Sequence, residues 1–332
     1  GSRRTARKAG PDHAPDHGLL NRFGPIVGAR GQARARPFRY FGRKPCTITH
    51  ALLAISVQAP VGNGLSGARG IRGTTVFMID LHTHLLPGID DGSPDLAVSL
   101  EMARIAVADG IRIMACTPHI TPGVFDNEGP LIRHAVEELA ASLLDHDIDL
   151  YLVSGADVHI APKLVEGMRS GRVPTVADSR YFLLEPPHHV VPPRMEELIA
   201  ECCAAGYVPL LTHPERLTWI ETHYSYIKRM VSAGAWIQLT AGSITGKFGS
   251  QPRYWSERML DEGIVHLIAS DAHNTGRRRP TMSKARDAVA ARLGEAEANH
   301  LCITRPLGIV KNRAPTDIVA PPAFAAADAR AT

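Results

Sequence analysis

The order of apolar runs after Met78 constrains the fold of this 332-residue chain more than any other feature. Seven short apolar runs alternate with stretches in which apolar residues recur every three or four positions, as in strands and amphipathic helices. The predicted strands span residues 79–82, 113–117, 149–154, 181–185, 208–212, 235–239 and 266–269. The predicted helices span residues 96–108, 131–144, 195–204 and 226–233. This alternation predicts an α/β fold with a parallel sheet, and the even spacing favours a closed, TIM-like (β/α)7 barrel over an open sheet.

Titratable side chains follow six of the seven runs at their carboxyl ends, where the active sites of such barrels lie. They are His82, His84, His119, Asp157, Glu185, His213, Asp271 and His273. The sixth run is followed only by Gln238 and Thr240, which are poor metal ligands. One histidine beside an apolar run is more often a hydrogen-bonded core residue than a ligand. So many donors at one end of a single barrel indicate a shared site.

The donor types point to metal chemistry. Imidazoles and carboxylates without thiolates suit Mn, Fe or Zn, and they disfavour a structural zinc site. A carboxylate such as Glu185 can bridge two ions about 3.5–4 Å apart, and a bridging hydroxide can then attack phosphorus in line. The donors are too many for one ion, so two or three ions are expected. Arg216 and the run Arg277-Arg278-Arg279 are placed to hold phosphate, because guanidinium pairs with phosphate in a bidentate manner.

The charge of the chain is divided unevenly along its length. The net charge is +4, but residues 1–77 hold 13 Lys and Arg against only Asp12 and Asp16, so the remainder is acidic. The main domain therefore gives no support for nucleic-acid binding. The chain has no apolar run of about 18 residues, which disfavours a membrane-spanning helix.

The five cysteines, an odd number without CxxC spacing, argue against a disulfide framework and favour a reducing compartment such as the cytoplasm. None of them is followed by an arginine six positions later. This excludes a phosphatase that uses a cysteine nucleophile in a CxxxxxR loop, so a phosphatase built on this sequence must use metal-activated water.

Several segments together resemble one known family. They are MIDLHTHLLPGIDDG (78–92), SLEMARIAVADGIR (99–112), TPH (117–119), GADVHI (155–160), FLLEPP (182–187), THPER (212–216), QLTAGSITGKFG (238–249) and IASDAHN (268–274). Their order and content resemble the polymerase-and-histidinol-phosphatase (PHP) superfamily. Within it they are most similar to the bacterial manganese-dependent protein-tyrosine phosphatases of capsular and exopolysaccharide gene clusters.

The resemblance implies a distorted PHP-type barrel over residues 78–310 and a Mn²⁺ centre that hydrolyses phosphotyrosine on a protein, commonly a polysaccharide-synthesis tyrosine kinase. It implies that Asp91 joins the ligands named above, and that Arg216 and Arg278 hold the substrate phosphate and act in catalysis with Asp271 and His273. The choice of Arg278 within its run rests on spacing alone. The family has Glu where this chain has Asp157, which is shorter by one methylene and is expected to hold its ion more weakly or through water. The oligomeric state stays open.

Three other functions compete with this interpretation. The same scaffold can hydrolyse a small phosphomonoester such as histidinol phosphate or a nucleotide. A non-catalytic binding domain would have lost several ligands, whereas only Asp157 departs from the family pattern. The basic leader could bind nucleic acid by itself.

The two ends of the chain differ in composition from the centre. Residues 1–77 are rich in Arg, Gly, Ala and Pro, and we interpret them as a basic leader that is disordered or not native. Residues 311–332 are rich in Ala and Pro and are predicted to form a disordered tail.

Overall fold

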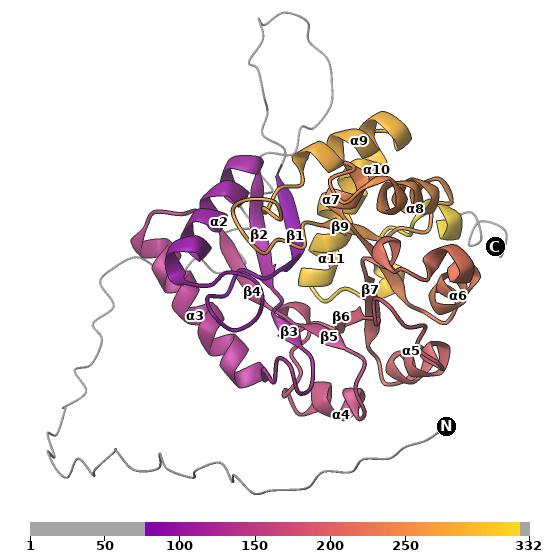
Figure 1. Cartoon of the computed structure of the whole chain (residues 1–332), viewed down its shortest axis with the longest axis horizontal. Helices are drawn as coiled ribbons and strands as arrows, with labels where there is room; N and C mark the ends of the chain where they lie inside the picture. Colours follow the sequence, from indigo (N-terminus) through magenta and orange to yellow (C-terminus); the bar gives the residue numbers. More distant parts are fainter. Residues whose placement is uncertain (1–76, 326–332) are drawn as a thin grey trace, which may run out of the picture. The chain divides into compact units, whose positions relative to one another are not determined.

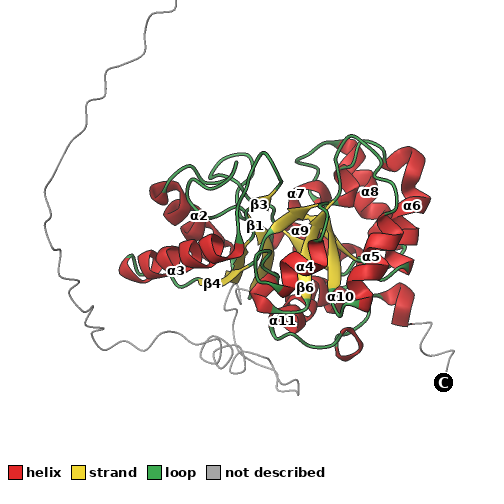
Figure 2. Cartoon of the chain, turned by 90° about the horizontal axis from the view of Figure 1, so that it is seen from below, coloured by secondary structure: helices red, strands yellow, loops and turns green. Residues whose placement is uncertain are grey.

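The apolar run after Met78 forms the first strand of a parallel barrel, and all six residues of this strand, β1 (Met78–Thr83), are buried. The computed structural model describes residues 77–325. The other strands are β2 (Ile111–Cys116), β3 (His119–Ile120), β4 (Tyr151–Ser154), β5 (Asp157–His159), β6 (Tyr181–Glu185), β7 (Val208–Thr212), β8 (Trp236–Thr240) and β9 (Leu267–Ala269). All of them pair in parallel, as predicted, with helices packed around them (Figures 1 and 2).

Each of the seven predicted strands is present, but two are followed by a short extra strand that the sequence analysis missed. β2 stops before Pro118, which has no amide hydrogen for a ladder, and β3 resumes at His119. β4 stops before Gly155, where a Cβ would lie 3.0 Å from the side chain of Thr117, and β5 resumes at Asp157. These interruptions divide the barrel into one sheet of order β1-β2-β4 and another of order β3-β5-β6-β7-β8-β9.

The two sheets meet again at the carboxyl end of β1. Thr83 forms a parallel bridge with Ala272, and the amide of Asp271 donates to the carbonyl of His82 at 2.9 Å. The carboxylate of Asp80 accepts from the amide of Ser270 at 3.0 Å, so a side chain of β1 also binds the backbone directly after β9. The barrel is therefore closed beside the residues that follow β1 and β9.

Alternate residues of the strands fill the interior of the barrel. Ile79 and Leu81 of β1, and Tyr181 and Leu183 of β6, belong to one buried cluster made mainly of strand residues. Val176, in the short helix η1 (Val176–Asp178), joins this cluster where β4 and β6 do not pair. The opposite faces of the strands pack against the helices in a second, larger cluster.

The helices agree with the prediction at α2 (Leu96–Asp109), α3 (Gly129–Asp145) and α5 (Met195–Ala204). Asp95 caps α2 by accepting from the amide of Val98 at 2.9 Å, and Gly110 ends it with φ +99°. The remaining longer helices are α6 (Ile220–Ser232), α8 (Ser250–Asp261) and α9 (Ser283–Leu293). α6 begins earlier than predicted, and α8 and α9 were missed because both are rich in polar residues. Within residues 77–325, no helix has the length and apolarity needed to cross a bilayer.

The short helices α10 (Glu295–Asn299), η3 (His300–Thr304) and α11 (Arg305–Val310) lead into the C-terminal segment. The predicted disorder is wrong for residues 311–325. Ile318 is buried, and the fully buried Arg305 donates to the carbonyl of Val319 at 2.8 Å while pairing with Glu297. Phe324 packs on the ring of His266. Residues 1–76 and 326–332, and with them the leader and the end of the tail, lie outside the described residues.

Candidate metal centre

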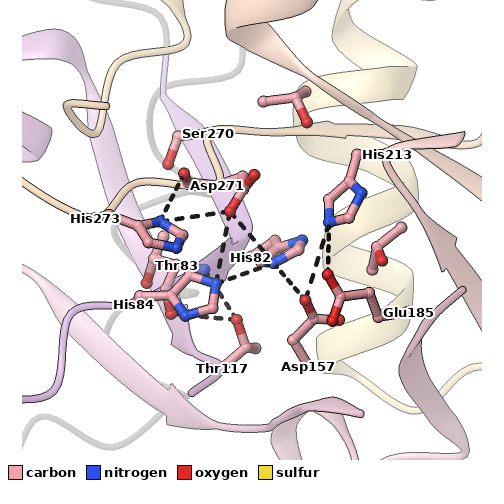
Figure 3. Close-up of polar contacts among 12 residues, drawn as sticks. His82, Thr83, His84, Thr117, Asp157, Glu185, His213, Ser270, Asp271 and His273 are labelled. Carbon is pink, nitrogen blue, oxygen red and sulfur yellow. Dashed lines mark hydrogen bonds and ion pairs between the residues drawn. The ribbon is translucent and has the colours of Figure 1, made fainter. Parts of the chain in front are cut away.

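His82 lies in the last residues of β1 and His84 directly follows the strand, and another side chain lies within hydrogen-bond distance of Nδ1 of each ring. The Nδ1 of His82 lies 2.8 Å from Oε1 of Gln238, and the Nδ1 of His84 lies 2.7 Å from Oδ2 of Asp90. An oxygen acceptor at Nδ1 places the ring proton there, which leaves the lone pair of Nε2 free to bind a metal ion. The two Nε2 atoms are 3.3 Å apart, so the HxH motif directs both into one site, as predicted (Figure 3).

Asp157 lies at the centre of this site. Its Oδ2 is 3.3 Å from Nε2 of His82, 3.7 Å from Nδ1 of His119 and 4.0 Å from Nε2 of His213. The side chain is fully buried, and neither oxygen makes a hydrogen bond of normal geometry within the described residues. A buried carboxylate without hydrogen bonds is costly unless a cation neutralises it. Despite its shorter side chain, Asp157 thus reaches three imidazoles of the predicted set.

Two further groups of donors flank the centre. On one side, His84, Asp91, His119 and His273 offer ligand atoms that all lie within 4.8 Å of one another. Asp91 is half exposed and lies 3.4 Å from Nε2 of His273. This group therefore opens toward solvent.

On the other side, Glu185, His188 and His213 form a second group within the same limit. Glu185 also belongs to a group with His119 and Asp157, so its two oxygens face different neighbours. This position between two groups is the one expected of a bridging carboxylate. His188 is absent from the predicted set, although its place three residues after Glu185, in the loop that follows β6, was a signal for it.

Asp271 links this centre to two arginines. Its Oδ1 lies 3.6 Å from Nε2 of His82 and 3.5 Å from Nε2 of His84. Its Oδ2 accepts from Nη1 of Arg216 and, at 2.7 Å, from Nη2 of Arg278. All nine predicted ligands and both predicted arginines therefore come together.

The three arginines of the run Arg277-Arg278-Arg279 differ in their contacts. Arg278 reaches the centre, whereas Arg279 donates to the carbonyl of Thr275 and Arg277 has no hydrogen bond or ion pair with any described side chain. The guanidinium of Arg216 is also stacked over the ring of Phe248, 5.0 Å from its centroid.

The backbone at two site residues is strained. His213 has φ +35° and Asp271 has φ +51°, a left-handed conformation that costs a non-glycine residue about 1–3 kcal/mol. Both residues directly follow, or nearly follow, a strand of the barrel. The turn at each position directs the side chain into the centre rather than along the strand.

The histidines of the centre differ in the direction in which their pKa values are shifted. Burial lowers the pKa of His84, but its hydrogen bonds to Asp271 and Asp90 outweigh burial and raise this pKa to about 10. Burial, with the neighbouring His84, lowers the pKa of His273 to about 4, and burial with Arg216 lowers that of His213. Without bound cations, the site therefore carries a proton on His84 in place of metal charge.

The donor set fits divalent ions. Nδ1 of His119 and Nε2 of His273, like the oxygens of Asp157, are buried and lack a hydrogen-bond partner among the described residues. Such orphaned lone pairs are explained by a bound ion. No described cysteine belongs to any of the candidate metal groups, as expected for a centre of nitrogen and oxygen ligands.

Comparison with known proteins adds an independent finding. A family model described as "Capsular polysaccharide synthesis, CpsB/CapC" matches residues 78–311. Tyrosine-protein phosphatase YwqE of Bacillus subtilis is 39% identical over 197 residues, which cover 59% of this chain and 78% of that protein. Tyrosine-protein phosphatase CpsB of Streptococcus pneumoniae is 26% identical over 244 residues, 71% of this chain and 99% of that protein.

The fold has a solved counterpart at a similar level of identity. A crystal structure from work on YwqE and CpsB, described as "unique metal-dependent tyrosine phosphatases", matches with a TM-score of 0.70 and 34% identity. The match covers 74% of this chain and 98% of that one.

Proposed function

Because the chain belongs to the CpsB/CapC family of capsular polysaccharide synthesis proteins, we propose that it is a metal-dependent protein-tyrosine phosphatase. The proposed substrate is a phosphotyrosine protein, a tyrosine kinase of polysaccharide synthesis, and the proposed metal is Mn²⁺. Residues 78–310 would form the phosphoesterase domain. The observation that carries this proposal is the buried Asp157, which lies among three imidazoles without a hydrogen bond to any described residue, beside an Asp271 that contacts two arginines.

The proposed ligands are His82, His84, Asp91, His119, Asp157, Glu185, His213, Asp271 and His273, and His188 is added to them. When bound, divalent ions supply a water that is nucleophilic at neutral pH and charge that offsets the phosphate. Glu185 is the proposed bridge, since its oxygens face two donor groups. The number of groups suits two or three ions.

The arginines are proposed to hold the phosphate. Asp271 contacts Arg216 and Arg278 through one oxygen, and no other acceptor within residues 77–325 binds their guanidinium groups. Nε of Arg278 is buried and has no acceptor among the described residues, so a phosphate oxygen would satisfy it. A guanidinium pair also stabilises the charge that develops on the phosphoryl group during transfer.

The free thiols support a reducing compartment, for which we propose the cytoplasm. The four described cysteines, Cys116, Cys202, Cys203 and Cys302, form no disulfide. Burial raises the pKa of the thiols of Cys116, Cys202, Cys203 and Cys302, which leaves them poor nucleophiles. This agrees with hydrolysis by water rather than through a cysteine.

The test is hydrolysis of a phosphotyrosine peptide by the full chain, before chelation, after chelation and after Mn²⁺ is restored. We expect activity to vanish with chelator, to return with Mn²⁺, and to be abolished in His82→Ala while the circular dichroism of the barrel is kept. Activity that survives chelation would refute the metal mechanism. Turnover of histidinol phosphate or a nucleotide far above that of the peptide would assign the site to small phosphomonoesters instead.

A further inference from the structure

A strongly basic cavity lies beside the two arginines of the candidate site. It is lined by residues from the loop after β8, which carries the short helix α7 (Ala241–Ile244), from the loop between β9 and α9, and from the first turn of α9. These two segments lie side by side at the carboxyl end of the barrel (Figure 1). Five of the lining side chains are cationic and none is acidic: Lys247, Arg277, Arg278, Arg279 and Lys284.

Most of this positive charge is not neutralised by the protein. Within residues 77–325, Lys247, Arg277 and Lys284 form no ion pair, and Arg279 donates only to the backbone carbonyl of Thr275. Only Arg278 faces a carboxylate, that of Asp271. The charge of residues 78–332 is negative overall, so an unpaired cationic cluster runs against the balance of the domain.

Nearby basic residues behave differently. Arg253, Arg258 and Arg292, on α8 and α9, each pair with a carboxylate of Glu257, Glu262 or Asp261. Cations on the outer faces of these helices are thus matched, and those that line the cavity are not. Unmatched cations at short range repel one another, and an anionic ligand relieves that repulsion.

The cavity is continuous with the place where phosphate is proposed to bind. Arg278 belongs to both, and Ser270 lines the cavity directly before Asp271 in the chain. Phe248 also lines the cavity, and the guanidinium of Arg216 is stacked over its ring. A phosphate held by Arg216 and Arg278 would therefore bring the adjoining part of its substrate over the unpaired cations.

We propose that this cavity binds a second anionic group of the substrate peptide, a carboxylate or a phosphate close in sequence to the phosphotyrosine. The proposal rests on the phosphatase function proposed above and defines its substrate class as acidic or multiply phosphorylated peptides. Guanidinium and ammonium donors suit both kinds of anion, and the doubly charged phosphate gains more from several cations.

The experiment compares three phosphotyrosine peptides with neutral flanks, with glutamate flanks and with a second phosphorylated residue. The cavity variant is Lys247→Ala/Lys284→Ala, which removes two exposed cations whose side chains form no hydrogen bond or ion pair with the described residues. The matched control is Lys311→Ala/Arg313→Ala, two exposed cations near the start of β6, at the opposite end of the barrel. Turnover of p-nitrophenyl phosphate reports the basal chemistry.

We expect the wild-type chain to prefer both anionic peptides over the neutral one in kcat/KM, and most of all the doubly phosphorylated one. The cavity variant should lose about tenfold on these two peptides, the effect expected when charge-assisted contacts worth about 1.4 kcal/mol disappear. It should keep wild-type rates on the neutral peptide and on p-nitrophenyl phosphate. The control variant should behave as wild type, and the preference should shrink as ionic strength rises.

Equal rates of the wild-type chain on all three peptides would overturn the inference while leaving the phosphatase function intact. An equal loss on every substrate in the cavity variant would also overturn it. If no peptide is hydrolysed, the phosphatase function fails, and fluorescence anisotropy of labelled peptides then decides the cavity separately. Tighter binding of the anionic peptides that the cavity variant loses would support the anion site, and equal binding of all three would refute it.

Discussion

Gln238 offers a sharp test of how the centre is organised, because it touches a proposed ligand without being one itself. It is fully buried on β8, and its Oε1 lies 2.8 Å from Nδ1 of His82. Its Nε2 is buried without a partner among the described residues, so the amide has no other visible role there. The substitution Gln238→Met keeps the length of the side chain and removes the acceptor.

The expected loss follows from this one contact. A net hydrogen bond of about 1–1.5 kcal/mol corresponds to roughly tenfold in affinity, and outer partners of metal-bound histidines typically contribute about 10–100-fold. We therefore expect the dissociation constant for Mn²⁺ to rise about 10–100-fold. At saturating Mn²⁺ the rate should return to within about twofold of wild type, because His82 itself is retained.

The assay is calorimetric titration of the metal-free protein with Mn²⁺, together with activity at buffered free Mn²⁺. Gln238→Glu is the matched control, since it keeps an oxygen acceptor for His82 and should not weaken Mn²⁺ binding. Melting of both metal-free variants shows whether the barrel is intact. Wild-type affinity in a folded Gln238→Met protein would refute the idea that this amide orients His82 for a metal.

Four other predictions address stability, pH and phosphate binding. Burial raises the pKa of Asp80 from 3.8 to about 6, so its ionisation destabilises the folded chain by up to about 3 kcal/mol above pH 6 and not at all below about pH 4. Asp80→Asn, which keeps the acceptor for the amide of Ser270, should then stabilise the metal-free protein at pH 7 but not at pH 4 in urea melts, and an equal effect at both would contradict this origin. Because His84 has a pKa of about 10 without metal, Mn²⁺ binding should release protons and strengthen as pH rises, and calorimetry in buffers of different ionisation enthalpy would expose an absence of proton release. Arg278→Ala should lower kcat/KM for a phosphotyrosine peptide by roughly 100-fold with unchanged Mn²⁺ affinity, and a changed affinity would instead make it a support of the metal centre. Ile318→Ala should cost about 2–4 kcal/mol in denaturant unfolding, since the buried Ile318 packs on the C-terminal helices, and no loss would mean that the C-terminal segment does not contribute to the folded barrel.

Local sequence predicted the elements whose burial depends little on context. β6 and β7 match their predicted bounds residue for residue, because each begins with four consecutive apolar residues that are all buried. β3 and β5 contain too few residues to form any periodic pattern, and they exist only because they pair with each other and with β6. The ordered structure of residues 311–325 could not be predicted from the local sequence either, since it depends on contacts with Arg305 and His266.

The candidate site likewise contains residues that the sequence predicted and residues that only the fold brings into it. Motif residues at strand ends were predicted because parallel strands deliver their carboxyl ends to one edge of the barrel. The sequence analysis did not predict Asp90, Gln238 and His188 as parts of the site. Each of them contributes through an atom that the fold brings close to a proposed ligand. Arg278 was a choice from spacing, and the contact with Asp271 now separates it from Arg277 and Arg279.

By itself, the sequence determined which donor types gather at the carboxyl end of the barrel, because chain direction in a parallel sheet leaves them no other edge. Only the tertiary structure decided which of them share a site and which hydrogen-bond to hold a ring. His82 and Gln238 are 156 positions apart in the sequence, yet Nδ1 of His82 lies 2.8 Å from Oε1 of Gln238. A distance of that kind depends on the packing of the whole barrel, and no local pattern in the chain encodes it.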